Sequence, residues 1–363
     1  MNCRLLYVVG ELCRGGSEHQ LYLLLKSMDR RQYCPHVVVW NFSENHHFTA
    51  VIRELGVPIH GFSKSLSVFA KIRRLRRLVL DLSPEVLHSY SFYLNVATSF
   101  AAHGTKTIAI GSVRSNYLTD RIEAGPILGK LSARWPGILI CNSFTAMQFA
   151  NKSRGFFNPR RLLVVPNGLD LNTMICAPIP SGTKARLLAI GSLIPVKRWD
   201  RLLEAVAELK KKALAFSVRI VGGGALRGAL EQQTRTLGLE SYVEFLGHRD
   251  DLPMLLSDST LLVHTSDAEG CPNVVMEAMA SGRPAVAIDA GDVPHLIEDG
   301  KTGFVARCGD FKTLVDCLAT LIADPSLCQR MGEAGRLKAM RDFSLERMVG
   351  DTLLAYEATG WKR

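Results

Sequence analysis

The sequence predicts an α/β protein of two domains, each a doubly wound, Rossmann-like parallel sheet covered by helices. Three observations lead to this prediction: the length of 363 residues, the alternation of short apolar runs with longer amphipathic segments, and a Pro/Gly-rich interruption near the middle. A chain of this length exceeds one domain of ordinary size and fits two. Because 47% of the residues are hydrophobic, both domains can bury a core, and extended disorder is not expected.

Short β-branched or apolar runs alternate with helical patterns such as Glu18–Met28 and Asn95–Ala102. In the first half the predicted strands are Leu5–Val9, His36–Trp40, Val86–His88, Thr107–Ile110, Ile138–Cys141 and Leu162–Val165. In the second half they are Arg186–Ile190, Ser217–Val221, Val243–Leu246, Leu261–His264 and Ala285–Ala287. Repeated strand–helix alternation gives parallel sheets with right-handed crossovers, so both halves are expected to be doubly wound.

The domain boundary is expected between Pro166 and Gly182, where Pro, Gly and Asn are frequent and no apolar period is present. We place an N-terminal domain at residues 1–170, a linker at 171–184 and a C-terminal domain at 185–343. Two facing domains of this type surround an interdomain cleft with the carboxyl ends of their strands. Ligands of such sheets bind there.

The positive charge lies in the first half of the chain. Residues 1–180 contain 21 Lys/Arg and 10 Asp/Glu, whereas residues 181–363 contain 23 and 24. Such a surface attracts polyanions, and the segment Phe69–Leu82 has the pattern of a basic amphipathic helix. Its cations are Lys71, Arg73, Arg74, Arg76 and Arg77. A solvated helix face and peripheral attachment to an anionic membrane both explain this pattern, whereas no motif for nucleic-acid recognition accompanies it.

The nine cysteines form no C-x-x-C pair and share no metal-like spacing with a histidine. We interpret them as reduced thiols of a cytoplasmic protein, and the pair His46-His47 as a feature of a surface loop. The first apolar run, Leu5–Val9, is too short for a membrane span and is expected to be a buried strand, not part of a signal peptide.

The segment most informative about function is His264–Val286, HTSDAEGCPNVVMEAMASGRPAV. A strand is expected to end at His264, and Glu269-Gly270-Cys271 then forms a tight loop. Proline suits the first turn of a helix, because the hydrogen-bond donor that it lacks would have no partner there. A helix is therefore expected to begin near Pro272.

The start of this helix is a candidate anion site. Backbone amides near Asn273 and Val274, with the positive end of the helix dipole, can bind a diphosphate. Glu277 follows on the same helix, where its carboxylate could accept hydrogen bonds from vicinal hydroxyls such as those of a ribose. The segment thus combines groups that would hold a nucleoside diphosphate.

This segment resembles the signature of family 4 retaining glycosyltransferases with the GT-B fold, in which E-x7-E, here Glu269 and Glu277, is followed by A-M-A-x-G-x-P. Further blocks match the family in the same order along nearly the whole chain. They are Gly15-Gly16-Ser17-Glu18, Cys141-Asn142-Ser143, Val165-Pro166-Asn167-Gly168-Leu169-Asp170, Gly191-Ser192-Leu193 through Lys197, Val221-Gly222-Gly223-Gly224 and Phe245-Leu246-Gly247. One block alone would be weak evidence, but the ordered set is strong.

The resemblance implies a role for each motif residue. Glu277 would bind the donor ribose, and Glu269 would lie beside the transferred sugar as a catalytic residue. Lys197 would neutralise the donor diphosphate, and Gly16 would let the first loop approach a substrate closely. The other donor-binding candidates are Ser192, Arg198, Gly222, Gly270, Asn273 and Val274. The glycine run at Gly222 also suits an ordinary strand-to-helix turn.

The resemblance also implies transfer without a metal or other cofactor. The charge that develops on the leaving nucleoside diphosphate must be stabilised for the sugar–oxygen bond to break. A fixed lysine and helix amides can supply this stabilisation. The chain also has no D-x-D carboxylate pair in the usual metal-binding context.

Several positions depart from the family pattern. Ser192 stands where many members have arginine, so Arg198 becomes a candidate for that phosphate contact. Cys271 replaces a common phenylalanine, and His295 stands where glutamate is usual. Members often carry H-x-H after an N-terminal strand, whereas this chain has His88-Ser89-Tyr90. His88 remains a catalytic candidate, and whether His88 or Tyr90 contacts the transferred sugar stays open.

We therefore expect a retaining glycosyltransferase that moves a sugar from a nucleotide-sugar, UDP-sugar before GDP-sugar, to a glycan or polyprenyl-diphosphate-linked acceptor in cell-surface glycan biosynthesis. The C-terminal domain would bind the donor and the basic N-terminal domain the acceptor. Residues 344–363 would form a helix that returns to the N-terminal domain. The expected location is the cytoplasm, with peripheral attachment to the inner face of the plasma membrane. A sugar-nucleotide epimerase of the same architecture and a non-catalytic sugar-nucleotide-binding protein are the alternatives.

Overall fold

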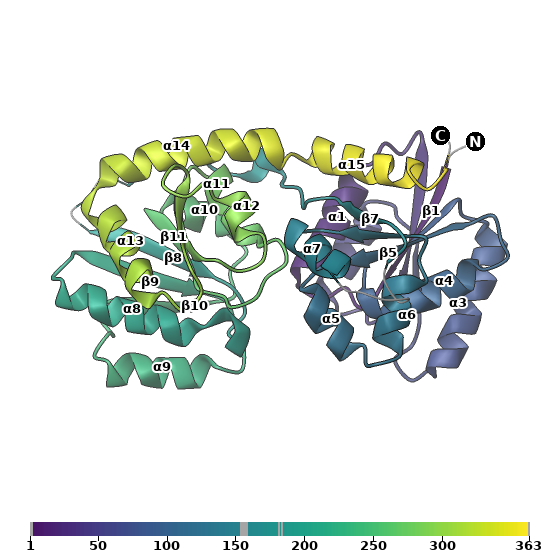
Figure 1. The fold of residues 1–363 in the computed structure, drawn as a ribbon, viewed down its shortest axis with the longest axis horizontal. Helices are drawn as coiled ribbons and strands as arrows, with labels where there is room; N and C mark the ends of the chain where they lie inside the picture. Colours follow the sequence, from purple (N-terminus) through teal and green to yellow (C-terminus); the bar gives the residue numbers. More distant parts are fainter. Residues whose placement is uncertain (1–2, 153–158, 181, 183, 362–363) are drawn as a thin grey trace. The chain divides into compact units, whose positions relative to one another are not determined.

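The computed structural model describes residues 3–152, 159–180, 182 and 184–361. The chain forms two compact units: unit 1 is Met1–Gly168 with Leu345–Arg363, and unit 2 is Leu169–Ser344 (Figure 1). Each unit contains one sheet, and the paired strands of both sheets run parallel. The predicted pair of Rossmann-like α/β domains is therefore confirmed.

The sheet of unit 1 has seven strands in the order β3-β2-β1-β4-β5-β6-β7. Their bounds are β1 Cys3–Val9, β2 Tyr33–Val39, β3 Ile59–Gly61, β4 Val86–Ser89, β5 Ile108–Val113, β6 Ile138–Cys141 and β7 Leu162–Val164. The strand order reverses between β1 and β4. Crevices for ligands open at such a switch point, at the carboxyl ends of the two strands.

Helices cover both faces of this sheet. They are α1 Gly16–Ser27, α2 His47–Glu54, α3 Val68–Leu82, α4 Asn95–Ala102, α5 Tyr117–Glu123, α6 Leu128–Arg134, α7 Phe144–Lys152 and α15 Leu345–Glu357. Alternate residues of β1 point to opposite faces: Leu5 and Tyr7 pack in the core formed with α1 and α15, and Leu6 and Val8 in the core formed with α3 and α4. A strand buried on both faces needs an unbroken apolar run, and this requirement is the reason that β1 was predictable.

The sheet of unit 2 has six strands in the order β10-β9-β8-β11-β12-β13. They are β8 Ala185–Ile190, β9 Phe216–Val221, β10 Val243–Gly247, β11 Leu261–His264, β12 Ala285–Ile288 and β13 Gly303–Ala306. The helices are α8 Trp199–Lys211, α9 Arg227–Thr236, α10 Leu252–Ser257, α11 Asn273–Ala280, α12 Val293–Leu296, α13 Phe311–Ala323 and α14 Pro325–Asp342. Within this unit, Figure 1 shows α8 and α9 on the side of the sheet opposite α10 and α11. The switch point lies between β8 and β11.

Two strands, β3 and β13, were not predicted. β3 has only three residues, and β13 begins at a glycine, Gly303, whose backbone conformation (φ +156°) few other residues adopt. Both are edge strands, each paired with one neighbour. Short edge strands lack the long apolar run that identifies a central strand, so composition alone does not distinguish them from loops.

The two units divide at Gly168, two residues before the boundary placed from sequence. The first residues of the predicted linker, 171–184, belong to unit 2, because Leu171 and Met174 pack against a core of that unit in which Leu169 is also buried. The last helix, α15, belongs to unit 1. Its Tyr356 is fully buried there, and its hydroxyl lies 3.2 Å from that of Tyr7.

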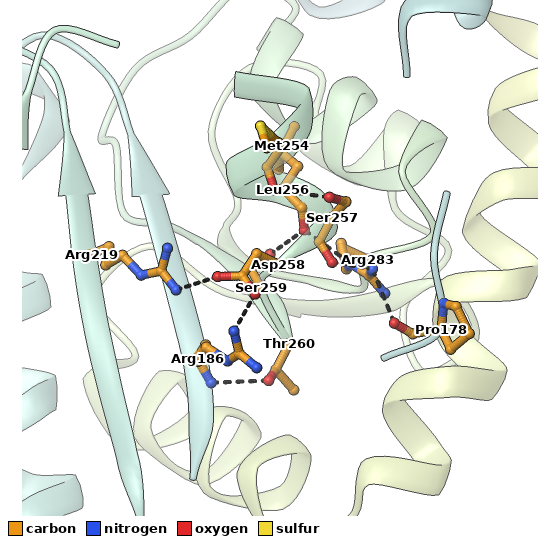
Figure 2. A network of polar contacts seen from close by, with 10 residues as sticks. All are labelled: Pro178, Arg186, Arg219, Met254, Leu256, Ser257, Asp258, Ser259, Thr260 and Arg283. Carbon is orange, nitrogen blue, oxygen red and sulfur yellow. Dashed lines mark hydrogen bonds and ion pairs between the residues drawn. The ribbon is translucent and has the colours of Figure 1, made fainter. Parts of the chain in front are cut away.

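Arg283 binds the predicted linker, residues 171–184, to the rest of unit 2. Its side chain is fully buried, and its guanidinium donates to the carbonyls of Leu256, Ser257, Ala177 and Pro178 at 2.6 to 3.3 Å. Figure 2 shows Arg283 with Leu256, Ser257 and Pro178. Beside it, Asp258 pairs with Arg186 and Arg219. Because a buried carbonyl without a donor costs about 1–3 kcal/mol, Arg283 is a structural residue of the A-M-A-x-G-x-P block.

The basic helix predicted at 69–82 is present as α3, but one of its cations is not on the exposed face. Lys71 is 4% exposed, donates to Asn41 Oδ1 at 2.7 Å and lies 5.7 Å from the ring centre of Trp40. Arg76 is also engaged, by the carbonyls of Ala101 and His103. Arg73, Arg74 and Arg77 are the exposed cations of this helix. In the described part of the chain, no helix is both long enough and apolar enough to cross a membrane.

Candidate functional site

The motif residues of unit 2 gather where β8 and β11 end side by side. Gly191 follows β8, and His264 is the last residue of β11. The next loops, residues 192–198 and 265–272, start from these two adjacent strand ends. The sheet topology therefore brings Lys197 and Glu269 to the place where open α/β sheets bind ligands.

Lys197 and Glu269 form a close ion pair. Lys197 Nζ lies 2.5 Å from Glu269 Oε1, and His264 Nε2 lies 3.3 Å from the same oxygen. All three side chains are mostly buried, with 22%, 13% and 4% of their side-chain surfaces exposed, respectively. The pair was not predicted from sequence, which gave each residue a separate role.

The Glu269 carboxylate is ionised at every working pH. Burial alone would raise its pKa, but the nearby imidazole of His264 and the ammonium of Lys197 outweigh burial and lower the pKa of Glu269 to about 2. A carboxylate held in this state does not serve as a general acid near pH 7. It can orient Lys197 and accept hydrogen bonds from a sugar hydroxyl.

The two loops are tied together by hydrogen bonds and ion pairs. Thr265 Oγ1 donates to the carbonyl of Lys197 at 3.0 Å, and the amide of Asp267 donates to the carbonyl of Val196 at 2.9 Å. Asp267 also pairs with Arg201 at 2.6 Å and with Arg198 at 2.9 Å. These contacts fix the backbone on both sides of the Lys197–Glu269 pair.

Arg198 does not reach the phosphate site freely in this arrangement. Its guanidinium donates hydrogen bonds to Asp200 and Asp267, and these two carboxylates raise the pKa of Arg198 above its usual value. The residue lies at φ +51°, a left-handed conformation that is uncommon for a residue with a side chain. These ion pairs within the protein explain the position of Arg198 without a ligand. Ser192, which stands where many family members have the phosphate-binding arginine, is exposed.

Gly270 lies against the loop that follows β12. A Cβ atom on Gly291 would lie 2.3 Å from the carbonyl oxygen of Glu269 and 2.6 Å from that of Gly270, and Gly291 has φ +58°. The amide of Asp292 donates to the Gly270 carbonyl at 2.9 Å. Only glycine allows this close approach, so Gly291 holds the Glu269 loop in place.

Gly222 makes a similar close approach. Its φ is +139°, and a Cβ atom there would lie 1.9 Å from the carbonyl oxygen of Gly191. The amide of Leu193 also donates to the Gly223 carbonyl at 2.8 Å. The glycine run is thus needed for close packing against the loop that leads to Lys197. This packing explains the glycines without any contact to a ligand.

Helix α11 begins at Asn273, with Pro272 at the position before it. The positive end of the helix dipole therefore lies at Asn273 and Val274, next to the Glu269 loop. Cys271, one residue earlier, is partly buried with its Sγ 3.5 Å from Met276 Sδ. Helix start, lysine and loop together form a site that favours an anion.

Glu277 lies in the second turn of α11 and is partly buried. Among the described residues, its carboxylate has no hydrogen-bond or ion-pair partner, and burial raises the pKa of Glu277 to about 7. An accessible, partly desolvated carboxylate without a partner is destabilised until a donor reaches it. The geometry therefore leaves Glu277 prepared to accept hydrogen bonds from a ligand.

In unit 1 a pocket lies at the switch point of the sheet, and we call it the Tyr90 pocket. It has a volume of about 410 Å³ and is lined by residues that follow β4 and β5, by Ser17 of α1 and by α5. Arg114 lies over the ring of Tyr90, 4.1 Å from its centre, and its Nε is buried with no hydrogen-bond partner among the described residues. Burial raises the pKa of Asp120, which also lines the pocket, to about 6.

The two candidate residues of the His88-Ser89-Tyr90 block, His88 and Tyr90, have different environments. His88 is 1% exposed, with Nδ1 2.8 Å from the hydroxyl of Tyr356 and Nε2 2.8 Å from that of Ser112. Both ring nitrogens are used inside the core, so we assign a structural role to His88 in place of the catalytic one. Tyr90 lines the pocket instead.

The remaining candidates are distributed between the two units. Gly16 is the first residue of α1, one residue before Ser17 of the unit 1 pocket. His295 is exposed on α12 of unit 2. Three residues of the unit 2 site were missed from sequence: His264, Asp267 and Gly291. The sequence did contain a signal for His264, because this residue ends a predicted strand directly before the E-x7-E block. No sequence pattern indicated that Asp267 would pair with Arg198 and Arg201.

Comparison with known proteins agrees with this arrangement. The profile of the family "Glycosyl transferases group 1" matches residues 177–338, and that of "Glycosyltransferase Family 4" matches residues 14–173. The Bacillus subtilis (strain 168) protein "Putative glycosyltransferase EpsD" is 32% identical over 334 residues, which cover 85% of each chain. The two profiles divide the chain close to the boundary between the two units.

Two further relatives are more distant. The "Lipopolysaccharide core biosynthesis glycosyltransferase LpsE" of Rhizobium meliloti (strain 1021) is 29% identical over 187 residues, 52% of this chain and of the relative. The crystal structure of Anabaena Alr3699/HepE in complex with UDP and glucose superposes with a TM-score of 0.83. The match covers 98% of this chain and 100% of the other at 20% identity, and therefore shows the shared fold.

Proposed function

Because the chain belongs to the family 4 glycosyltransferases (glycosyl transferases group 1) and has their GT-B fold, we propose that it is a retaining enzyme that uses a UDP-sugar. Membership of this family makes the protein a glycosyltransferase. The proposed acceptor is a lipid-linked or polysaccharide glycan of the cell surface. The Rhizobium relative is described as acting in lipopolysaccharide core biosynthesis, which supports this setting.

The observation that supports this proposal best is the arrangement around α11. Lys197 is paired with Glu269, which lies four residues before the first residue of the helix, and Glu277 has no partner among the described residues on that helix. In the proposed complex, Glu277 accepts hydrogen bonds from the ribose hydroxyls. The diphosphate lies at the start of the helix near Lys197, and Glu269 contacts the transferred sugar.

Chemistry follows from these positions. As the bond between the anomeric carbon and the β-phosphate oxygen breaks, negative charge grows on the diphosphate, and Lys197 with the positive helix end stabilises it. The acceptor hydroxyl attacks from the same face, and its proton passes to the leaving phosphate. Neither glutamate needs to form a covalent bond. We also propose that no metal ion takes part.

The acceptor is assigned to the pocket of unit 1. This pocket lies at the carboxyl ends of β4 and β5 and combines tyrosine, serine, arginine and carboxylate side chains. Such groups hydrogen-bond to sugar hydroxyls, and the ring of Tyr93, which is 46% exposed, offers an apolar face. Substitution of Arg114 is expected to raise the KM for the acceptor and to leave donor affinity unchanged.

Donor binding is tested by thermal shift with UDP-glucose, UDP-N-acetylglucosamine, GDP-mannose and ADP-glucose. A bound donor raises the melting temperature by mass action. Glu277→Ala is expected to abolish the shift, whereas Glu240→Ala, which removes an exposed glutamate of the same unit, is expected to keep it. An unchanged shift in Glu277→Ala would show that the nucleotide lies elsewhere.

Activity is tested with and without an acceptor. Anomeric analysis of the product by NMR decides between retention and inversion. Conversion of the UDP-sugar to its epimer in the absence of acceptor would identify the epimerase alternative, and donor binding with no turnover on any acceptor would identify the non-catalytic one.

We also propose that the protein attaches peripherally to an anionic membrane through α3, from the cytoplasmic side. Val68 and Phe69 at the start of this helix are 65% and 76% exposed, and Arg73, Arg74 and Arg77 are exposed beside them. Apolar and cationic side chains on one helix suit insertion at a bilayer surface. Flotation with phosphatidylglycerol vesicles tests this, and binding that is indifferent to salt and lipid charge would contradict it.

A further inference from the structure

A second cavity of unit 1 lies at the opposite edge of the sheet from the Tyr90 pocket. It has a volume of about 790 Å³ and is bordered by Ile108 and Ile138, the first residues of β5 and β6. Because these strands are parallel, their amino-terminal ends lie away from the carboxyl ends where the sugar acceptor is proposed to bind. The volume is within the range of small-molecule sites, about 300–1,000 Å³.

Two aromatic side chains form exposed walls of this cavity. Phe100 of α4 is 53% exposed, and Trp135, directly after α6, is 46% exposed. Both rings line the cavity, and α4 and α6 pack against each other. Large apolar side chains left open to solvent beside a cavity mark a place where an apolar group can be buried.

The charged side chains that line the cavity are both arginines. Arg160 and Arg161 are exposed there, whereas no Asp or Glu is among the described lining residues. Arg161 donates to the carbonyl of Ala358, which fixes its position at the cavity wall. Arg160 has no hydrogen-bond or ion-pair partner among the described residues. Two guanidinium groups on one cavity wall, with no carboxylate among the lining residues, favour a phosphate, because a guanidinium can bind phosphate with paired hydrogen bonds.

We propose that this cavity binds an amphipathic phosphate, with the phosphate on Arg160 and Arg161 and the apolar part against Phe100 and Trp135. The site differs from both substrate sites and requires neither sugar transfer nor attachment through α3. Two sources share this ligand chemistry: the headgroup region of an anionic lipid in a bilayer, and a soluble phosphorylated amphiphile.

Trp135 provides a direct signal for binding. The other tryptophans, Trp40, Trp199 and Trp361, are 4–5% exposed, so a ligand in the cavity should change mainly the fluorescence of Trp135. The probe is dihexanoyl phosphatidic acid below its micelle concentration, titrated into the full-length protein. We expect a saturable change that is absent in Trp135→Phe, with calorimetry as an independent measure of the Kd.

Two variants test the two parts of the ligand. Removal of both guanidinium groups in Arg160→Ala/Arg161→Ala is expected to weaken binding by about tenfold or more. Gly137→Phe is expected to fill the cavity, since a Cβ atom at Gly137 meets no atom within 4 Å, and should weaken binding without a change of charge. The matched control, Lys26→Ala/Arg31→Ala, removes the same charge from two exposed cations of the same unit and should keep the Kd within about twofold.

Three comparisons decide the outcome. Equal weakening in the Lys26/Arg31 control and in the Arg160/Arg161 variant would overturn the proposal, because the probe would then be attracted by the overall positive charge of the unit and not by this cavity. Inorganic phosphate that binds as tightly as the probe would also overturn it, because the aromatic walls would contribute nothing. Saturation of the Trp135 signal by phosphatidic acid vesicles, but not by phosphatidylcholine vesicles, supports it with bilayer lipid as the source. A response to the monomer alone supports it with a soluble source.

Discussion

Lys197 Nζ lies 2.5 Å from Glu269 Oε1 in unit 2, although the two residues are 72 positions apart in the sequence. The pair joins the cation that we propose to bind the donor diphosphate to the carboxylate that we propose to lie beside the transferred sugar. Each group holds the other, since Glu269 stays ionised because of Lys197 and His264, and Lys197 is kept in one place by Glu269. Residues that act as such a unit should be coupled energetically.

The coupling is measurable in a double-mutant cycle. Lys197→Ala is expected to lower kcat/KM by about 100- to 1,000-fold, because it removes a charge that stabilises the leaving diphosphate. Glu269→Gln should also lower kcat/KM, and the double variant should lose much less than the product of the two losses. Lys312→Ala, an exposed lysine of α13 in the same unit, is the control and should have full activity. Strictly multiplicative losses would mean that the pair does not act as a unit.

Glu269 should also contribute to acid sensitivity. Its pKa in the folded protein, about 2, is lower than the usual value of 4.5, so its stabilising contribution is present above pH 4.5 and is lost as the pH falls toward 2. We expect urea unfolding of Glu269→Gln to show less loss of stability between pH 5 and pH 3 than the wild-type protein. Identical pH slopes for the two proteins would contradict the lowered pKa.

Donor affinity should depend on pH through Glu277. Burial raises the pKa of Glu277 to about 7, so the free protein holds a proton there below this pH, whereas a ribose is bound best by the ionised form. The affinity for UDP-glucose, whose diphosphate does not titrate in this range, should fall as the pH is lowered from 8 to 6. The limiting slope is about tenfold per pH unit. Glu277→Gln should bind weakly and show a flat profile in calorimetry, and a wild-type slope in this variant would assign the titration to another group.

Metal removal should leave the reaction intact. We propose that Lys197 and the start of α11 supply the positive charge that a divalent cation would otherwise provide at the diphosphate. Initial rates after dialysis against EDTA are therefore expected to lie within about twofold of untreated enzyme, with no further gain on addition of Mg²⁺ or Mn²⁺. A rate that collapses with EDTA and returns with one cation would show that this charge stabilisation is incomplete.

His88 should be required for stability and not for chemistry. His88→Phe removes its hydrogen bonds to Tyr356 and Ser112 and should lower the free energy of unfolding by about 1–3 kcal/mol. Tyr356→Phe removes one of the same bonds from the opposite side and should cost about 1 kcal/mol. Both variants are expected to keep kcat within about threefold, measured at a temperature where they are folded. A loss of kcat in His88→Phe that exceeds that in Tyr356→Phe by more than tenfold would restore a catalytic role to His88.

The prediction of the central strands succeeded because a parallel strand buried on both faces requires continuous apolar residues. β1 and β11 meet this requirement, with four or more consecutive buried residues in each. It failed at two of the four edge strands, β3 and β13, whereas the edge strands β7 and β10 were predicted. The exposed face of α3 was predicted only in part, because helical spacing cannot show that Lys71 turns back to Asn41.

The sequence by itself determined the alternation of strands and helices, the family through its ordered blocks, and the identities of Lys197, Glu269 and Glu277 as candidates for one site. The pairing of Lys197 with Glu269 was decided only by the tertiary structure, as were the burial of His88 against Tyr356 and the unpartnered state of the Glu277 carboxylate. The physical reason is the same in each case. Local patterns follow from neighbours along the chain, whereas a pKa or an ion pair depends on which distant segments the sheet order places next to one another.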